Sequence, residues 1–483
     1  MPGAGQRDAP LSPVEAIDHL LAYLPRPSRL LVAVSGGSDS IGLLVALKQA
    51  IDHSPPDTFE IVAATVDHGL RPESAAEASS VGDFCQRLDI PHVIRRWAGI
   101  KPATGVAAAA RTARYDLLCQ VAAERQACVI VTGHTFDDQI ETIAMRGARS
   151  GGGVGSTGMA SSTILDRRFP LLRPFLATRR DAIRDLLRNE AIPWVEDPSN
   201  IDRRSERARL RQDLPTVPVG DEAEVLRQWR EAAEGRRQLS AAAADLAGDY
   251  LSLHHRVAAR LDLDVLTGDQ GALRLLIGAL TAVIGGRVHV PSRAVQARIG
   301  QFLDNASPGR MTAGRVLFER RREALYMVRE DRDLPILRVE IGETVVWDGR
   351  FRISNHSDQA LDVRPTLMTS GQGGQSGEGG PDAAHQQPIT GGLPPRIARL
   401  ARRSLPMVTE CHGETAGLTI ERVLLPFDRF LPEFDWQLAN SLAAVAELPS
   451  FPPSPFDVFS RKTGSAPAVA LARGRRNPML SDK

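Results

Sequence analysis

An apolar run that leads directly into a Ser- and Gly-rich turn constrains this chain more than any other feature. Residues 30–34 are all apolar, which is typical of a parallel strand covered on both faces. Six residues then turn the chain into an apolar helical pattern: Ser35, Gly36, Gly37, Ser38, Asp39 and Ser40. The two glycines lack the Cβ atoms that would keep an oxyanion from backbone N–H groups. The free N–H groups and the positive dipole end of the following helix also suit a phosphate.

This turn differs from the common nucleotide-triphosphatase loop, which needs Gly-Lys-Ser/Thr after four spacer residues. No lysine follows here before Lys48. The turn resembles instead the pyrophosphate loop of the ATP pyrophosphatase superfamily, whose members cut ATP between the α and β phosphates and transfer AMP. The alternative is an ordinary Gly/Ser turn, which six matching positions between a strand and a helix disfavour. We therefore assign ATP binding to Ser35–Ser40.

Strand and helix patterns alternate after this turn. Strand patterns at residues 59–66, 92–97 and 128–131 are separated by helix patterns at 74–88 and 106–126. This alternation predicts an α/β fold with a Rossmann-like parallel sheet and right-handed crossovers. Ligands of such sheets bind at the carboxyl ends of the strands, so the polar residues that follow each strand are the candidate site.

The length of 483 residues allows about three domains of roughly 150 residues each. We expect a catalytic domain at 1–215, a mostly helical middle domain at 221–334 and a small α+β domain at 335–460. Residues 369–392 are rich in Gly, Ser and Gln, which predicts a disordered insertion. The basic residues 461–483 are expected to form a flexible tail.

Composition excludes several classes of site. None of the four cysteines forms a Cys-x-x-Cys pair, so a zinc ribbon, an iron–sulfur site and a dithiol relay lack their usual spacing. The net charge of +1 rules out a polycation, although a local basic face is enough to bind nucleic acid. No signal peptide or membrane-spanning stretch is visible, so we expect a soluble, cytoplasmic protein.

Acidic residues of the candidate site suggest a metal. Asp39 would repel phosphate unless it held Mg²⁺, and Asp138 is a candidate second ligand, because Mg²⁺ usually takes one or two carboxylates plus phosphate oxygens. Helix capping is the alternative explanation of Asp137 and Asp138.

Cations and histidines complete the set. Arg114 and Arg146 are candidates to neutralise charge that develops at the α-phosphate. His68 and His134 are candidates for nucleotide contact or proton transfer. The alternative for each histidine is a structural hydrogen bond at a strand end.

Six motifs occur in a fixed order: Ser35–Ser40, Asp67–Arg71, Ala110–Tyr115, Gly133–Thr142, Arg146-Gly147 and Glu196–Asn200. Together they resemble the bacterial tRNA(Ile)-lysidine synthase family across residues 30–215. The resemblance implies that the C2 oxygen of the wobble cytidine in a CAU anticodon attacks the α-phosphate of ATP. The ε-amine of free lysine then displaces AMP, which leaves lysidine and changes the codon read from AUG to AUA.

The resemblance also implies roles for further residues. Glu141 or Asp137 would hold the lysine ammonium or accept its proton, and the Gly-rich stretch Gly151–Gly158 would close over the flipped-out cytosine. The later domains would grip the tRNA, and further contacts are expected at Arg71 and Arg207 of the first domain. Expected cofactors are ATP and Mg²⁺, and a homodimer is among the expected partners.

A short helix near residue 400 carries arginines at steps of three and four, among them Arg396 and Arg399. They form either an RNA-phosphate face or an ordinary solvated face.

The sequence departs from the family pattern in four places. The Gly-rich loop is longer than the common pattern, and the insertion 369–392 weakens the match in the last domain. Thr135-Phe136 stand where the family often has a second histidine, and Ala208 replaces a residue that is usually Asn. One alternative enzyme is a tRNA thiolase of the same superfamily, which should carry Cys-x-x-Cys pairs. A second alternative is a non-catalytic RNA-binding protein that uses ATP as a structural ligand, against which Asp39 and Asp138 argue.

Overall fold

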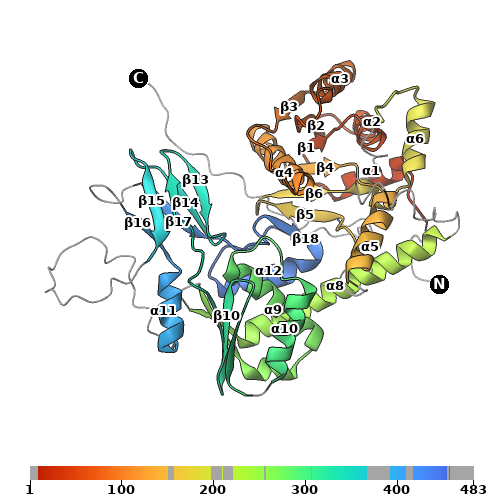
Figure 1. Ribbon diagram of the computed structural model, residues 1–483. Helices are drawn as coiled ribbons and strands as arrows, with labels where there is room; N and C mark the ends of the chain where they lie inside the picture. Colours follow the sequence, from red (N-terminus) through yellow and green to blue (C-terminus); the bar gives the residue numbers. More distant parts are fainter. Residues whose placement is uncertain are drawn as a thin grey trace. The chain divides into compact units, whose positions relative to one another are not determined.

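Figure 1 shows the computed structural model, in which the chain divides into two compact units. The first unit comprises Met1–Gly235 and Pro452–Lys483, and the second comprises Arg236–Phe451. The described residues are 9–150, 157–196, 209, 221–254, 257–305, 307–366, 392–409, 417–453 and 456. Arg207, the tail, and nearly all of the Gly-rich loop 151–158 and of the insertion 369–392 lie outside them. The three-domain division stays a prediction.

A mainly parallel sheet forms the centre of the first unit. Its strands are β1 (Ser28–Ala33), β2 (Phe59–Asp67), β3 (His92–Arg96), β4 (Val129–Thr132), β5 (Ser162–Leu165) and β6 (Phe169–Leu172). They lie in the order β5-β6-β4-β1-β2-β3, and all adjacent pairs are parallel except β5 and β6. The predicted α/β fold with an N-terminal parallel sheet is confirmed.

Helices cover both faces of this sheet (Figure 1). They are α1 (Pro13–Tyr23), α2 (Ser38–Asp52), α3 (Ser74–Arg87), α4 (Val106–Glu124), α5 (Phe136–Ser150) and α6 (Arg180–Asn189). On one face, Leu30 and Val32 of β1 join a core with α1, α2, α3 and α6. Successive strand residues point to opposite faces, so Leu31 faces the other side, where α4 contacts β1.

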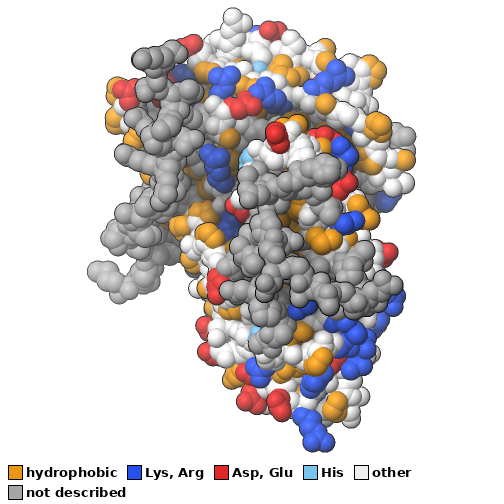
Figure 2. Space-filling view, turned by 90° about the vertical axis from the view of Figure 1, so that its left-hand side faces the viewer, with side chains coloured by type: hydrophobic (Ala, Val, Ile, Leu, Met, Phe, Trp, Pro, Cys, Tyr) orange, Lys and Arg blue, Asp and Glu red, His pale blue; other side chains and the backbone are white. Residues whose placement is uncertain are grey.

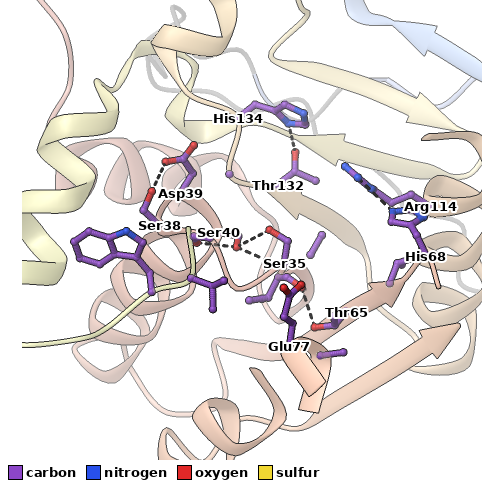
Figure 3. Close-up of a pocket in the computed structure, with 18 of the residues that line it drawn as sticks. Ser35, Ser38, Asp39, Ser40, Thr65, His68, Glu77, Arg114, Thr132 and His134 are labelled. Carbon is purple, nitrogen blue, oxygen red and sulfur yellow. Dashed lines mark hydrogen bonds between the residues drawn. The ribbon is translucent and has the colours of Figure 1, made fainter. Parts of the chain in front are cut away.

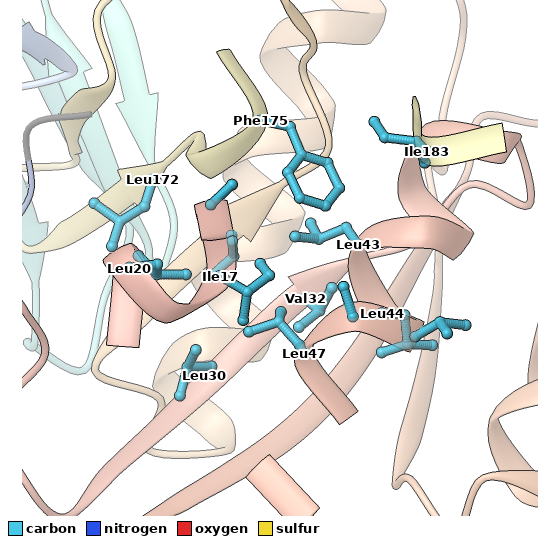
Figure 4. Packing of buried hydrophobic residues seen from close by; sticks show 14 of the residues in the cluster. Ile17, Leu20, Leu30, Val32, Leu43, Leu44, Leu47, Leu172, Phe175 and Ile183 are labelled. Atoms are coloured by element: carbon cyan, nitrogen blue, oxygen red, sulfur yellow. The ribbon is translucent and has the colours of Figure 1, made fainter. Parts of the chain in front are cut away.

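The core holds the turn between β1 and α2 in place. Figure 4 shows Leu43, Leu44 and Leu47 of α2 packed among side chains of α1 and β1. Each of these three leucines is fully buried. Burying such a side chain contributes about 1.5–3 kcal/mol, so this packing fixes where α2 begins.

The structure adds elements that the sequence reading left out. β5 was not expected, and α6 begins at Arg180, after a 3₁₀ turn at Pro174–Ala177. Pro174 opens this 3₁₀ turn, and it lacks the N–H that a longer helix interior needs.

The second unit combines helices with small antiparallel sheets. α8 (Glu222–Tyr250) contains the boundary between the units, and α9 (Gln270–Gly285) and α10 (Arg293–Asp304) follow it along the chain. An antiparallel hairpin joins β10 (Val316–Arg320) to β11 (Ala324–Arg329). It lies inside a larger sheet, in the order β7-β8-β11-β10-β9, with β7 (Leu251–His254), β8 (Ala258–Asp262) and β9 (Gly309–Ala313).

Later elements of this unit form two further three-stranded sheets and two helices. The sheets are β12 (Leu337–Val339), β15 (Leu361–Pro365) and β16 (Pro406–Thr409), and β13 (Thr344–Trp347), β14 (Phe351–Asn355) and β17 (Leu418–Arg422). The helices are α11 (Pro395–Arg403) and α12 (Trp436–Val445), preceded by β18 (Phe430–Pro432). Within the described residues, none of the helices is long and apolar enough to cross a membrane.

The turns that follow β1 and β4 lie in direct contact. β1 pairs with β4 through Ala33 and Thr132, so the two turns emerge side by side. A Cβ atom on Gly133 would lie 2.5 Å from the carbonyl oxygen of Asp39. Only glycine permits this approach without moving the backbone at Asp39.

We expect Gly133→Ala to lower the free energy of unfolding by about 1–3 kcal/mol, the usual cost of overpacking, measured by urea denaturation. Gly147→Ala on α5 is the matched control, because nothing among the described residues lies within 4 Å of the added methyl group. The control should keep or raise the stability. Equal stabilities of Gly133→Ala and the unchanged protein would contradict the close contact of the two turns.

Candidate active site

A cleft of about 1140 Å³ opens at the carboxyl edge of β1, β2 and β4. The turns after these three strands line it, together with one face of α4, the start of α6 and residues 194–196. In Figure 3 the Ser35–Ser40 turn lies on one side of the cleft, and His68 and Arg114 lie on the other. The predicted polar turns therefore meet in one cavity, as the rule for open α/β sheets requires.

Hydrogen bonds within the Ser35–Ser40 turn hold its shape. The Ser35 N–H donates to Ser40 Oγ at 3.0 Å, and Ser40 Oγ donates to the Gly37 carbonyl at 3.1 Å. Gly36 has a φ of +87°, a backbone conformation that residues with a side chain rarely adopt. Gly37 is the N-cap of α2 and has no side chain to occupy the first N–H groups of the helix. These features make the turn a suitable phosphate cradle.

A segment from a later part of the chain covers this turn. The Val195 N–H donates to the Gly36 carbonyl at 2.9 Å, and Trp194 lines the cleft beside it. Glu196 accepts a hydrogen bond from Arg184 at 3.4 Å. The other residues of the predicted Glu196–Asn200 motif lie outside the described part of the chain. Sequence reasoning placed this motif but did not give Trp194 and Val195 a role.

One arginine connects the predicted metal-binding aspartates. Arg180 Nε donates to Asp39 Oδ2 at 3.1 Å, and its Nη2 donates to Asp138 Oδ1 at 3.1 Å. Burial raises the pKa of Asp39, and the nearby Asp138 carboxylate adds to this effect, while Arg180 opposes it. Burial disfavours the charge of Arg180, but Asp138 and Asp39 hold its pKa above the usual value.

The sequence reading missed Arg180. It stands in the first turn of α6, where the helix dipole disfavours a cation. That unfavourable position was the signal that could have identified it.

Asp137 and Asp138 both have structural partners. Thr135 and Asp138 form a capping box, in which the Thr135 N–H donates to Asp138 Oδ2 at 2.9 Å. Asp137 Oδ2 accepts the Arg180 N–H at 2.8 Å, at the start of α6, and its other oxygen pairs with Arg179. The capping interpretation therefore holds for both residues. Asp138 has a second oxygen toward Arg180, so capping and ligation are compatible for it.

His68 is held as a neutral ring on the other side of the cleft. Arg114 Nη2 lies 3.4 Å from its Nε2, and the Trp97 ring packs edge-on against it. Burial and the Arg114 charge lower the pKa of His68 to about 4. A neutral Nε2 that accepts from Arg114 suits a contact with nucleotide better than proton transfer near neutral pH.

The remaining predicted residues divide by position. His134 and Arg71 line the cleft, where His134 Nδ1 lies 2.9 Å from the Thr132 hydroxyl and Arg71 pairs with Glu77 at 3.0 Å. Gly36, Glu141 and Arg146 do not line it. Glu141 is buried 4.0 Å from Arg180, and Arg146 donates to the Gly158 carbonyl.

The two α11 arginines belong to a different unit. Arg396 and Arg399 are exposed on the helix face opposite Ile397 and Leu400. Arg207 lies outside the described residues.

Among the described residues, no group of three or more His, Cys, Asp or Glu side chains is arranged to hold a metal ion. A metal here would therefore depend on phosphate oxygens for part of its ligands.

Comparisons with known proteins agree on one family. The family model of the PP-loop domain matches residues 13–217. The tRNA(Ile)-lysidine synthase of Rhizobium meliloti is 39% identical over 449 residues, which are 89% of this chain and 94% of that protein. The enzyme of the same name from Mesorhizobium japonicum is 37% identical over 454 residues, or 90% of this chain and 96% of that protein.

A more distant likeness is to a solved U34-tRNA thiolase from Methanococcus maripaludis, with a TM-score of 0.36 and 16% identity. It covers 45% of this chain and 77% of that one. A likeness this low does not bear on function.

We expect the His68 ring to stay neutral from about pH 5.5 to pH 8 because its pKa is about 4. An unfolded histidine takes up its proton near pH 6.5, so burying neutral His68 lowers stability as the pH falls from about 6.5 toward 4. NMR titration of the His68 Cε1 resonance, assigned with His68→Gln, measures this pKa. A midpoint near 6.5 would show that the ring is not held neutral.

Proposed function

Because this chain belongs to the tRNA(Ile)-lysidine synthase family, we propose that it uses ATP to join lysine to the wobble cytidine of the CAU-anticodon isoleucine tRNA. The C2 oxygen of the base attacks the α-phosphate, and pyrophosphate leaves. The lysine ε-amine then attacks C2, and AMP leaves with the former base oxygen. The amine gives up its proton in this second step.

The observation that carries the proposal is the meeting of three turns in one cleft. The Ser35–Ser40 turn, the turn after β2 and the turn after β4 all line this cavity. Backbone N–H groups at the start of α2 suit the leaving pyrophosphate. Adenylation is chemically necessary, because the oxygen of an amide-like carbonyl leaves readily only after activation.

Arg114 is the proposed charge partner of the α-phosphate. It lines the cleft beside His68. Because the His68 ring is neutral, it does not neutralise the positive charge of Arg114. A fixed cation beside the reacting phosphorus stabilises the extra negative charge of the transition state. Arg146 is the second candidate for this role; it donates to the Gly158 carbonyl and does not itself line the cleft.

The donor set also fits Mg²⁺. Asp39 and Asp138 supply hard carboxylate oxygens next to the phosphate turn, and Arg180 bonds both of them. Mg²⁺ usually keeps one or two carboxylates and completes its ligands with phosphates and water. When bound, it would neutralise charge on the phosphate chain.

Glu141 is the proposed partner of the lysine amine. It is 5% exposed and does not itself line the cleft, but it lies one helical turn after Asp137 and Asp138, which do. Asp137 is less suited to this role, because both of its oxygens already contact residues at the start of α6.

Recognition of the tRNA body is proposed for basic residues of both units. Figure 2 shows Lys and Arg side chains gathered on the lower part of the face it draws. Such surfaces attract a phosphate backbone. The candidate contacts remain Arg71, Arg207, Arg396 and Arg399. A homodimer and a cytoplasmic location stay predictions.

The thiolase alternative is less well supported. Sulfur transfer needs a reactive cysteine in the cleft, and Cys85, Cys119 and Cys128 do not line it. Burial also raises the pKa of the Cys85 thiol to about 11, which makes it a poor nucleophile. The non-catalytic alternative gives Asp39 no role beyond its contacts with Arg180 and Ser38.

With ATP, Mg²⁺ and labelled lysine, the purified protein should incorporate label into the CAU isoleucine tRNA and release AMP and pyrophosphate in equal amounts. The same tRNA with a uridine at the wobble position is the control, and it should stay unlabelled. Sulfur transfer without lysine uptake would favour the thiolase instead.

Asp39→Asn should reduce pyrophosphate release by at least about 10²-fold and leave tRNA affinity nearly unchanged, because it removes one anionic ligand of the phosphate site. Asp52→Asn at the far end of α2 is the control, since Asp52 is exposed and pairs with Lys48 of the same helix. Equal rates of release for the two variants would remove Asp39 from the proposed mechanism.

A further inference from the structure

We propose that Arg180 is an internal counter-ion, which occupies the Asp39–Asp138 carboxylates and gives them up when a divalent cation binds together with ATP. This inference rests on the proposed use of Mg²⁺ by those two residues. It assigns a role to a side chain that the sequence reading did not select.

The first argument is the geometry of the contacts. One guanidinium bonds both carboxylates, through Nε to Asp39 and Nη2 to Asp138, each at 3.1 Å. The same Nη2 donates to the Thr135 hydroxyl at 3.3 Å, and Nη1 lies 4.0 Å from Glu141. Arg180 therefore occupies one oxygen of each carboxylate, while the other Asp39 oxygen, Oδ1, accepts from the Ser38 hydroxyl at 3.0 Å.

The second argument is electrostatic. The side chains of Arg180, Asp39 and Asp138 are only 17%, 25% and 10% exposed, so water screens their charges weakly. Two carboxylates this close repel each other, and a buried carboxylate pair without a cation is costly. Arg180 itself starts a helix, where the dipole disfavours its charge. The charges of Arg180, Asp39 and Asp138 are therefore stabilised mainly by one another.

The third argument concerns the way the ions exchange. An arginine does not lose its proton at accessible pH, so a metal can reach these oxygens only if the guanidinium moves. The backbone of α6 stays anchored for two reasons. The Arg180 N–H donates to the Asp137 carboxylate, and the side chains of Ile183 and Leu187 are fully buried. The side chain lines the open cleft, so it can turn toward phosphate oxygens, which bind guanidinium strongly.

Exchange of this kind makes metal and nucleotide binding depend on each other. Without ATP, Arg180 competes with the metal for the carboxylates. With ATP, the phosphates accept the guanidinium and also ligate the metal. Linkage then requires that ATP raise the metal affinity by the same factor as the metal raises the ATP affinity.

Binding of Mn²⁺, followed by EPR without tRNA or lysine, tests this exchange directly. Without nucleotide, Arg180→Ala should bind Mn²⁺ at least about tenfold more tightly than the unchanged protein. Arg180→Lys keeps a charge but loses the fork that joins two carboxylates, so its affinity should fall between the two. With a non-cleavable ATP analogue, the gain in Mn²⁺ affinity should be smaller for Arg180→Ala than for the unchanged protein.

Arg184→Ala is the matched control for loss of one positive charge. Arg184 stands one turn later on α6, lines the same cleft and bonds Glu196. Its removal should leave Mn²⁺ affinity within about twofold. If Arg180→Ala folds poorly, Arg180→Gln keeps the aliphatic stem and gives the same comparison.

Equal Mn²⁺ affinity of Arg180→Ala, Arg184→Ala and the unchanged protein would overturn the inference. A similar gain for both arginine variants would also overturn it, because the effect would then be one of net charge alone. The assay contains neither lysine nor tRNA. Its outcome is therefore independent of whether the unchanged protein forms lysidine.

Discussion

The contact between two backbone turns, at the ends of β1 and β4, is the constraint on which this site depends. Parallel pairing of these strands brings Gly133 against the Asp39 carbonyl, and no side chain fits between them. The starts of α2 and α5 are thereby fixed next to each other. As a consequence, Asp39 and Asp138 both accept hydrogen bonds from the Arg180 guanidinium, although they are 99 positions apart in the sequence.

Charge in the cleft is arranged in two zones. Beside the phosphate turn, Arg180 forms ion pairs with both Asp39 and Asp138. Arg114 and the neutral His68 lie across the cavity (Figure 3). A buried ionic group is weak evidence for stability, because desolvation opposes the attraction of its charges. We interpret it as a functional arrangement, in which one cation is held ready to be replaced by another.

Local signals in the sequence gave most of the first unit. The apolar β1 run and the Ser35–Ser40 turn each depend on neighbours within a few residues, and the structure has both. Distant partners were not predictable in the same way. Arg180 meets Asp39 across 141 positions, and the strands β7, β8 and β9 are short segments whose pairing is not visible in their own patterns. The contact of Arg146 with the Gly158 carbonyl, 12 positions away, was likewise not predictable from its own neighbours.

The central claim is that this cleft transfers the adenylyl group of ATP to an RNA base before lysine reacts. The most direct measurement uses ATP labelled at the α-phosphate, with the CAU isoleucine tRNA and no lysine. The account predicts that label becomes attached to the tRNA at its wobble nucleotide and is released as AMP when lysine is added. Label that stays off the tRNA, and appears instead on lysine when lysine and ATP are mixed without tRNA, would contradict it.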